Sequence, residues 1–397
     1  MGSQTPLDID KTSDVERTIL KPAHQTTGVL AGPWTRRKIS IFAGLILFGL
    51  GLVAMIITLP IVLPRKHHQG YDPNDPSSYP TPNDAIPNRK DDPTHPIRVL
   101  NNFPDPGLVE YNGTWYAFGT NPKKNDPDVH PHIPIAISHD FIHWNRTTHD
   151  ALPTLAPWER KRNHWAPDVI QRDDGKFLMY YAGELKDWRR HHCVGVAVSN
   201  DTNPLGPYRP QEKPLACPRL YGGAIDPSPF RDTDGKLYVT YKADGNSVGH
   251  GGDCNNGKDK KVPVPIMLQE LESDGVTPVG EPVQILNIEK DDGPLVEAPN
   301  IVKSEQGIYF LFFSSHCFTS PWYDVKFATS KSLKGPYKRA KRALLKTGDY
   351  GLIAPGGATV SRDGTKMVFH ADCEAFRCMY AAGIKIHSNE TITFDAV

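Results

Sequence analysis

Between residues 101 and 397, the chain repeats one pattern of hydrophobic and polar positions five times. The clearest copy is Ala224–Lys242, AIDPSPFRDTDGKLYVTYK. An acidic residue beside a proline opens a short apolar run, a charged turn with a glycine follows, and an aromatic, β-branched run ends the unit. Such runs on both sides of a glycine turn predict a pair of antiparallel strands. The other four copies are Phe103–Thr120, Trp165–Gly183, Val296–Ser314 and Ala354–Ala371.

The spacing of the copies predicts how they assemble. Their turn glycines are Gly113, Gly175, Gly235, Gly307 and Gly364, so the intervals are 62, 60, 72 and 57 residues. A period of roughly 40–70 residues with strand–turn–strand content is typical of a β-propeller with one repeat per blade. Two further apolar runs follow each copy, such as IPIAIS after the first, and supply a third and a fourth strand. We therefore predict an all-β, five-bladed β-propeller over residues 101–397.

Propeller geometry places the loops as well. The first strand of each blade lies at the central channel, so all five first strands begin at one rim. The loops between second and third strands frame that mouth, and the turns after first and third strands lie on the opposite face. Cysteines fall near the mouth, at Cys193, Cys217, Cys254, Cys317, Cys373 and Cys378. Asn-X-Ser/Thr acceptors for glycans fall at or near the opposite turns, at Asn112, Asn145, Asn200 and Asn389.

The N-terminal quarter of the chain has a different composition. Residues 1–38 are polar and have no apolar periodicity, so we expect a cytoplasmic tail. Residues 39–63 carry no charge and exceed the roughly 20 apolar residues that cross a bilayer. Residues 64–100 are rich in proline, aspartate and asparagine, which predicts an extended stem.

The apolar segment could be a signal anchor or a cleaved signal peptide. A signal peptide would have a shorter apolar core, nearer the N-terminus, and a small-residue cleavage site. Here 38 residues precede the segment and bulky residues close it, which favours an uncleaved anchor. Because all six cysteines and all four glycan acceptors follow residue 63, we expect a single-pass type II protein whose C-terminal domain is extracellular or lumenal.

Charge gives little sign of a partner. Lysine plus arginine and aspartate plus glutamate number 45 each, so nothing favours nucleic acid or an anionic membrane surface. We expect contact with a membrane only through residues 39–63, and we expect a monomer.

Carboxylates open four of the five inner strands: Asp105, Asp168, Asp226 and Glu297. An isolated Asp-Pro pair usually marks a turn. Four carboxylates at equivalent positions of a closed ring would instead converge and repel one another, which a fold tolerates mainly where function requires it. Glycoside hydrolysis uses such a group, because one protonated acid donates to the leaving oxygen and one ionised carboxylate activates water or attacks. A third carboxylate can raise the pKa of the acid.

The mouth loops also pair histidine or aspartate with cysteine, in the segments His191–Cys193, His250–Cys254, His316–Cys317 and His370–Cys373. A soft-metal cluster could use such ligands, but the paired C-x₂-C spacing is missing. Three disulfides beside a sugar cleft are the simpler interpretation. Six cysteines allow 15 pairings. Cys373–Cys378 would close a hairpin loop and Cys254–Cys317 would join adjacent blades, so these two pairs are favoured.

The motifs DPGLVEYNGTWYAFGT, SHDFIHW, HWAPDVI, AIDPSPF and VEAPNI, in this order, resemble glycoside hydrolase family 43, the arabinanase and β-xylosidase group of five-bladed propellers. The resemblance covers residues 101–397 and implies an inverting mechanism. Asp105 matches the general base, Asp226 the residue that modulates the pKa of the acid and orients it, and Glu297 the general acid. Inversion also implies that the Asp105 and Glu297 carboxyl groups lie roughly 6.5–9.5 Å apart.

The resemblance bears on the rest of the pocket. Trp165 and Asp168 match a pocket segment, in which we expect Asp168 to bind substrate or to serve structure. Family members often carry a histidine in a glycine-rich segment of the fifth blade, where it binds a channel ion or a water cluster. Gly357 stands there in this chain, with His370 on the next strand as the candidate replacement. The chemistry requires no cofactor and no metal, and calcium is the ion that the resemblance leaves open.

Aromatic side chains near the mouth could stack on sugar rings, and arginines could contact hydroxyl groups. The aromatic candidates are Trp158, Trp165, Trp188, Phe318, Trp322 and Phe376, and the arginines are Arg189, Arg190 and Arg377. The full set of predicted substrate contacts is Trp165, Asp168, His370, Arg377 and Trp322.

We therefore expect a membrane-anchored, inverting glycosidase that acts on arabinose- or xylose-containing polysaccharides or oligosaccharides. A retaining, fructosidase-like propeller would need its two carboxyl groups roughly 5–5.5 Å apart, and WAPDV and SHDFIHW argue against it. A non-catalytic carbohydrate-binding propeller is the third hypothesis, against which the three intact acidic positions argue. Arabinosyl or xylosyl specificity, and internal or terminal cleavage, depend on the mouth loops and stay open at this point.

Overall fold

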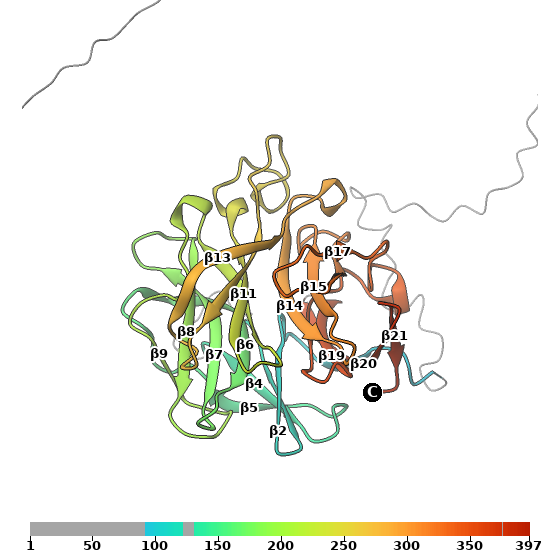
Figure 1. The fold of residues 1–397 in the computed structure, drawn as a ribbon, viewed down its shortest axis with the longest axis horizontal. Helices are drawn as coiled ribbons and strands as arrows, with labels where there is room; N and C mark the ends of the chain where they lie inside the picture. The colour runs from blue at the N-terminus through green and yellow to red at the C-terminus, as the bar shows by residue number, and fades with distance from the viewer. Residues whose placement is uncertain (1–91, 122–130, 375) are drawn as a thin grey trace, which may run out of the picture. The chain divides into compact units, whose positions relative to one another are not determined.

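The repeats fold into five antiparallel sheets, each of which takes its inner strands from one repeat (Figure 1). The structure, a computed structural model, describes residues 92–121, 131–374 and 376–397. Blade 1 comprises β2 (Gly107–Tyr111), β3 (Thr114–Phe118), β4 (Pro134–Ser138) and β5 (Asn145–Asp150). Blade 2 comprises β6 (Glu159–Gln171), β7 (Phe177–Leu185), β8 (His192–Ser199) and β9 (Tyr208–Pro210). The all-β, five-bladed propeller that the repeats predict is confirmed.

The remaining blades follow the same order. Blade 3 comprises β10 (Ala224–Arg231), β11 (Leu237–Ala243), β12 (Ile266–Leu271) and β13 (Pro278–Leu286), and blade 4 comprises β14 (Val296–Lys303), β15 (Tyr309–Ser315), β16 (Asp324–Ser330) and β17 (Lys338–Arg339). Blade 5 comprises β18 (Gly356–Val360), β19 (Lys366–Cys373), β20 (Phe376–Ile386) and β21 (Ile392–Asp395). Short 3₁₀ helices lie in connecting loops at Arg219–Tyr221, Gly245–Val248, Asp253–Asn255, Lys290–Asp292 and Asp349–Gly351.

Second strands that are apolar on both faces hold the ring together. On β7, Leu178 and Tyr180 pack with blade 3, whereas Phe177, Met179 and Tyr181 pack with blade 1. Similar clusters of buried side chains join blades 3 and 4, blades 4 and 5, and blades 5 and 1. Because neighbouring blades cover both faces, β7, β11 and β15 are buried along their whole length, which explains the lack of alternation in these runs.

The ring is closed by a strand that the sequence pattern did not reveal. Residues Ile97–Leu100 form β1, which pairs antiparallel with β20 in blade 5. The predicted stem, residues 64–100, therefore ends too late, and the propeller starts before the predicted residue 101. Ile97, Val99 and Leu100 pack against the buried cluster between blades 5 and 1, and this burial fixes a segment that follows a proline-rich stretch.

Replacing residues 97–100 by Gly-Ser-Gly-Ser in the full chain should lower the midpoint of thermal unfolding by roughly 5–10 °C, because three half-buried apolar side chains and a ladder of hydrogen bonds are lost. Replacing Thr391, in the exposed turn before β21, by serine is the matched control and should change the midpoint little. Calorimetry of both variants checks this. An unchanged midpoint would show that β1 does not close the ring.

Three disulfides join the cysteines: Cys193–Cys217, Cys254–Cys317 and Cys373–Cys378. Both favoured pairs are confirmed. The second links blades 3 and 4, and the third closes the β19–β20 hairpin.

The glycan acceptors occupy the turns expected of them. Asn112 lies between β2 and β3, Asn200 between β8 and β9, and Asn389 between β20 and β21, while Asn145 is the first residue of β5. All four are exposed. Their glycosylation stays a prediction.

The predicted tail 1–38, the predicted anchor 39–63 and residues 64–91 of the stem lie outside the described residues. No helix in the described ranges is long enough and apolar enough to cross a membrane.

Candidate active site

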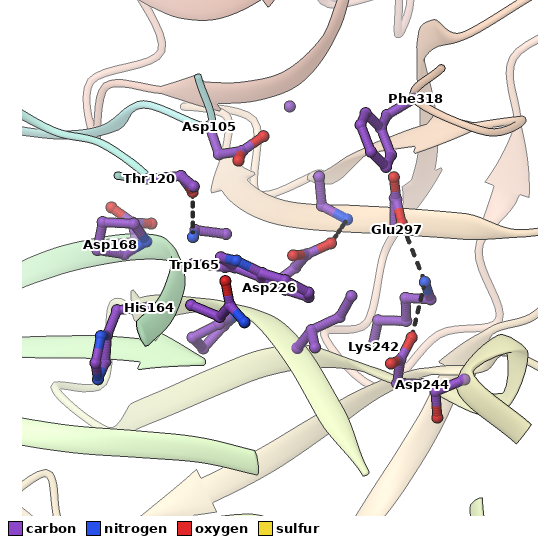
Figure 2. A pocket seen from close by; sticks show the side chains of 18 of the residues that line it. Asp105, Thr120, His164, Trp165, Asp168, Asp226, Lys242, Asp244, Glu297 and Phe318 are labelled. Carbon is purple, nitrogen blue, oxygen red and sulfur yellow. Dashed lines mark hydrogen bonds and ion pairs between the residues drawn. The ribbon is translucent and has the colours of Figure 1, made fainter. Parts of the chain in front are cut away.

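The rim at which the inner strands begin encloses a cavity of about 900 Å³. Figure 2 shows the carboxyl groups of Asp105, Asp226 and Glu297 in this pocket. Asp168, Trp165 and Arg377 line it as well. The propeller therefore brings together all four predicted carboxylates, contributed by four different blades.

A left-handed residue before a proline lies in the inner strand of each blade or just before it. The five residues and their φ angles are Asp105 (52°), Ala166 (42°), Asp226 (54°), Ala298 (52°) and Ala354 (47°). This conformation is uncommon outside glycine, and aspartate tolerates it better than most residues. In blades 2 to 4 the pairing with the second strand shifts at this residue, so each of these inner strands turns as it leaves the rim. In blade 5 the shift lies between Gly356 and Thr359, across Gly357, whose φ is 60°.

The shared turn shows that the four carboxylates are not equivalent, as the sequence analysis assumed. Asp105 and Asp226 occupy the left-handed position itself. Glu297 precedes that position by one residue, and Asp168 follows it by two. A one-residue offset in a strand turns a side chain to the other side, so the four groups meet different surroundings and can differ in protonation.

Asp168 connects inner strands of neighbouring blades. Its Oδ1 atom accepts hydrogen bonds from the backbone N–H groups of Leu108 (3.3 Å) and Val169 (2.9 Å), and its Oδ2 atom accepts one from the Ser228 hydroxyl (2.8 Å). Asn300 continues this chain by donating to Ser228 Oγ at 3.0 Å. Burial raises the pKa of Asp168 to about 7 despite these bonds. Of the two roles expected for Asp168, this geometry supports the structural one.

Asp105 is held by two basic side chains of blade 5. Arg377 Nη1 donates to Asp105 Oδ1 at 2.8 Å, and the backbone N–H of Asp105 donates to His370 Nδ1 at 3.2 Å. Burial alone would raise the pKa of Asp105, but Arg377 and His370 outweigh it and hold that pKa well below its usual range. Asp105 is therefore ionised at neutral pH.

His370 supports Asp105 and does not line the pocket, which corrects its assignment as a substrate contact. Its side chain is fully buried, and burial together with Arg377 lowers its pKa, so the ring is neutral. A Cβ atom at Gly357 would lie 2.7 Å from His370 Nδ1. The imidazole thus fills the space that Gly357 leaves open, directly beside Asp105.

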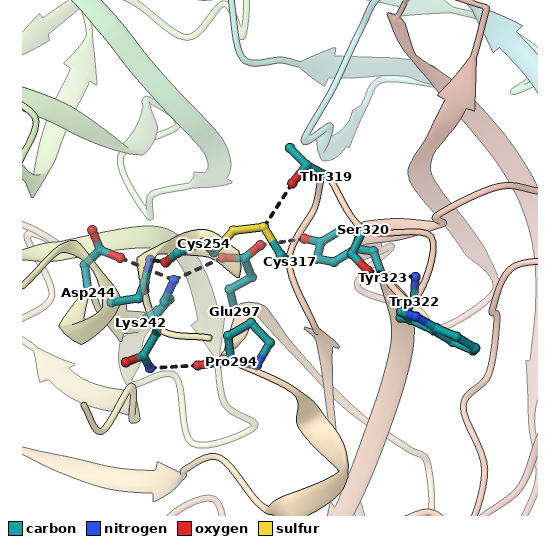
Figure 3. The surroundings of a disulfide bond; sticks show 12 residues. Lys242, Asp244, Cys254, Pro294, Glu297, Cys317, Thr319, Ser320, Trp322 and Tyr323 are labelled. Atoms are coloured by element: carbon teal, nitrogen blue, oxygen red, sulfur yellow. Dashed lines mark hydrogen bonds and ion pairs between the residues drawn. A yellow bond between two sulfur atoms is a disulfide. The ribbon is translucent and has the colours of Figure 1, made fainter. Parts of the chain in front are cut away.

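Trp322, the other predicted contact, is also absent from the pocket lining. It lies in the β15–β16 loop, where its backbone N–H donates to Ser320 Oγ, and its side chain is largely exposed. Figure 3 shows its indole pointing away from Glu297. Phe318 from the same loop does line the pocket and packs against Arg377, whose guanidinium carbon is 4.9 Å from its ring centre.

Glu297 has two buried partners, neither of which the sequence analysis identified. Lys242 Nζ donates to Glu297 Oε2 at 3.0 Å, and the Tyr323 hydroxyl donates to Oε1 at 2.9 Å. Lys242 also lies 3.2 Å from Asp244 Oδ1, so its ammonium sits between two carboxylates (Figure 2). A lysine near the end of an otherwise apolar second strand, LYVTYKA, was the available signal. The side chain is fully buried, and such a charge requires partners.

Asp226 is electrostatically coupled to Glu297. Its Oδ2 atom accepts the backbone N–H of Ala298 at 2.9 Å, which places it one residue from Glu297. Burial and the charge of Glu297 raise the pKa of Asp226 to about 8, against the opposing effect of Lys242. The Asp226–Glu297 pair therefore retains a proton at neutral pH, while Asp105 retains none.

Trp165 forms one wall of the pocket and stacks on His192, with ring centres 3.7 Å apart. His192 is buried, and among the described residues neither of its ring nitrogens has a hydrogen-bond partner. Burial lowers its pKa to about 3, so it supports the indole as a neutral ring.

The Cys254–Cys317 disulfide lies beside the Lys242–Glu297 pair (Figure 3). By linking the loops after β11 and β15, it fixes the two blades that supply Lys242 and Glu297.

The residues around His370 do not suit a calcium ion. Its Nε2 atom lies 3.4 Å from Arg377 Nη1, and Asp105 is already paired with the same guanidinium, which would repel a cation. In the part of the chain that the structure describes, no group of three or more His, Cys, Asp or Glu residues could hold a metal ion.

Comparison with known proteins identifies related sequences. A family model described as glycosyl hydrolases family 43 matches residues 95–383. An extracellular endo-α-(1→5)-L-arabinanase of Thermotoga petrophila is 27% identical over 265 residues, which are 59% of this chain and 50% of that protein. A β-xylosidase of Bacillus subtilis is 25% identical over 258 residues, 60% of this chain and 41% of that one. The chain thus spans half or less of the length of these relatives.

Solved structures share the fold. A thermostable family-43 glycoside hydrolase has a TM-score of 0.62 at 22% identity, covering 76% of this chain and 95% of that one. A Cellvibrio cellulosa α-L-arabinanase complexed with arabinohexaose has a TM-score of 0.56 at 21% identity, covering 75% and 96%.

Proposed function

Since the chain belongs to glycosyl hydrolases family 43, we propose that it is an inverting glycosidase that cleaves arabinose- or xylose-containing polysaccharides or oligosaccharides. One observation carries the proposal. The pocket holds an ionised carboxylate, Asp105, and a separate carboxyl pair, Asp226 and Glu297, that retains a proton. Inverting hydrolysis needs this division between a base and an acid.

In the proposed reaction, Asp105 accepts a proton from a water molecule as that water attacks the anomeric carbon. Glu297 donates its proton to the glycosidic oxygen, so the carbon–oxygen bond breaks and the leaving sugar departs as an alcohol. The attack comes from the face opposite the leaving group, which inverts the anomeric configuration. Asp105 then loses its proton to water, and the Asp226–Glu297 pair takes one up.

The other pocket residues prepare these steps. Arg377 and His370 keep Asp105 ionised and fix its orientation. Tyr323 and Lys242 hold the two oxygens of Glu297, and Asp226, whose pKa is raised, keeps a proton on the carboxyl pair. Trp165, supported by His192, presents an apolar face to a sugar ring.

The substrate panel for the full-length protein is an aryl α-arabinofuranoside, an aryl β-xyloside and linear arabinan. We expect hydrolysis of at least one of them, reduced about 10³-fold by Asp105→Asn. Asp173→Asn, an exposed carboxylate in the β6–β7 turn, is the matched control and should retain activity. Failure on all three substrates, or full activity of Asp105→Asn, would refute the proposal.

Replacing Asp226 by asparagine should move the alkaline limb of the kcat–pH profile to lower pH by about one unit or more, because the carboxyl pair loses the group whose pKa burial and Glu297 raise. The acidic limb, which reports Asp105, should stay in place. A profile measured from pH 4 to 10 follows the alkaline limb, and activity that is retained down to pH 4 shows that the acidic limb has not moved up. An alkaline limb that stays or moves to higher pH would contradict the proposed role of Asp226.

We also propose that the catalytic domain is extracellular or lumenal and that residues 39–63 anchor it. Two relatives are named extracellular arabinanases, and the three disulfides suit an oxidising compartment. Release of the full-length protein from membranes by alkaline carbonate would contradict the anchor.

A further inference from the structure

Four exposed basic side chains line one side of the pocket. They are Lys161, Arg162, Arg189 and Arg190, and all four come from blade 2. The acidic groups in the pocket lining are Asp105, Asp168, Asp226, Asp244 and Glu297, of which Asp168, Asp244 and Glu297 are buried. The proposed base and acid among them, Asp105 and Glu297, already have cationic partners in Arg377 and Lys242.

The fold presents these cations through two irregular segments. In β6, the pairing with β7 shifts between Glu159 and His164, so residues 160–163 bulge from the strand. Arg189 and Arg190 lie in the β7–β8 loop, which faces the same mouth. Both segments are tied to one buried carboxylate, Glu184, which accepts hydrogen bonds from Asn163 Nδ2 (2.7 Å) and from the backbone N–H of Arg190 (2.9 Å).

The charge of these four residues is not balanced locally. Glu184 lies 3.5 Å from Arg160 Nε, and Asp187 lies 2.7 Å from Arg219 Nη2, so the nearby carboxylates are paired with other arginines. Within the described ranges, none of the four side chains lies in an ion pair. The chain as a whole has equal numbers of basic and acidic residues, so this excess does not follow from composition.

We infer that the blade 2 side of the pocket binds an anionic group, a carboxylate or a sulfate ester, carried by the sugar chain that enters the pocket. Guanidinium groups pair with planar carboxylates and with tetrahedral oxyanions through two parallel hydrogen bonds. The inference rests on the proposed function, because it assumes that the ligand is a sugar chain. It narrows the substrate class to acidic arabinose- or xylose-containing glycans.

Binding of uncleavable, sulfur-linked oligosaccharides to the full-length protein tests this inference without hydrolysis. The probes are xylo- and arabino-oligosaccharides with one glucuronate branch, the same molecules with that carboxyl reduced to an alcohol, and the alcohol forms with one sulfate ester. In at least one series we expect the glucuronate form to bind about tenfold more tightly than its alcohol form at 20 mM salt. The preference should largely disappear at 0.5 M salt, because partly exposed charges are screened. The sulfate form shows whether a carboxylate or any oxyanion is recognised.

The double variant Arg162→Gln/Arg189→Gln should abolish this preference, so that the charged and alcohol forms bind to it with equal affinity. Lys341→Gln/Lys385→Gln is the matched control, because these exposed lysines lie in blades 4 and 5 outside the pocket, and it should retain the preference. Equal affinity for charged and alcohol forms, or a preference that survives Arg162→Gln/Arg189→Gln, would overturn the inference. Charge-selective binding without hydrolysis of any substrate would support the anion site and refute the proposed function. Hydrolysis without charge selection would support the proposed function and refute the anion site.

Discussion

Replacing Glu297 by glutamine is expected to lower kcat/KM on an oligosaccharide about 10³-fold, because the leaving sugar then departs without a proton. The loss should be about tenfold or less on a dinitrophenyl glycoside of the same sugar, since this leaving group is stable as an anion and needs no acid. Steady-state kinetics on the two substrates measure the difference. A general acid gives this dependence on the leaving group, and a residue that only supports the fold does not.

Two variants act as controls for this result. Glu305→Gln changes the same residue type in the exposed turn after β14 and should leave both activities unchanged. Asp105→Asn should lower kcat/KM on both substrates to a similar extent, because hydrolysis of either substrate needs the attacking water. Equal losses on both leaving groups in Glu297→Gln would contradict the assignment of Glu297 as the acid.

Replacing Lys242 by methionine should lower the free energy of unfolding by about 3–5 kcal/mol at pH 8, because Glu297 and Asp244 lose a buried cation. The partners of Lys242 raise its pKa in the folded protein. Its stabilising effect is therefore complete below the unfolded pKa, and is lost only as the pH rises through the folded value. Without the ammonium, ionisation of the buried carboxyl groups beside it costs more free energy. The loss in free energy of unfolding should therefore grow as the pH rises from 5 to 8.

Denaturant unfolding at pH 5 and pH 8 checks the size and the direction of this effect. Lys236→Met is the matched control, because Lys236 pairs with Glu270 at the surface with more than half of its side chain exposed. It should cost far less stability than Lys242→Met, because an exposed ion pair is screened by solvent. Adding Asp244→Asn to Lys242→Met should restore part of the lost stability. A deficit that shrinks from pH 5 to pH 8 would show that the ammonium does not compensate these carboxylates.

The architecture could be predicted from the sequence because it depends on local signals. Glycine turns mark the first hairpin of each blade, and runs that are apolar on both faces mark strands covered on both sides. The five repeats then imply closure and bring Asp105, Asp226 and Glu297 to one rim. Two disulfides could be predicted from the same geometry. Cys373–Cys378 closes a hairpin, and Cys254–Cys317 joins adjacent blades.

The differences among the carboxylates could not be predicted, because they depend on backbone conformation. The left-handed residue before each proline makes Asp105 and Asp226 equivalent and offsets Glu297 by one residue. A residue before proline ordinarily prefers extended conformations, so the sequence gives no sign of this turn. Strand β1 was missed for a related reason. It is four residues long, and it is stabilised by pairing with β20, about 280 residues later in the chain, and by packing against the buried cluster between blades 5 and 1.

The partners of the catalytic candidates were missed because they are distant in sequence. Lys242 reaches Glu297 from another blade, and His370 reaches Asp105 across 265 residues. Arg189 and Arg190 were expected to contact sugar hydroxyls. No sequence marker predicted the bulge at residues 160–163, which places Lys161 and Arg162 in the same pocket. Their combined charge became visible only in the folded chain.

Inversion of configuration is the most direct consequence of a base and an acid that act on opposite sides of the sugar. Proton NMR, recorded in the first minutes of hydrolysis by the full-length protein, identifies the anomer that is released before mutarotation. We expect an α-arabinofuranosyl substrate to release the β-anomer first, or a β-xylosyl substrate to release the α-anomer first. Initial release of the anomer with the configuration of the substrate would contradict the proposed roles of Asp105 and Glu297.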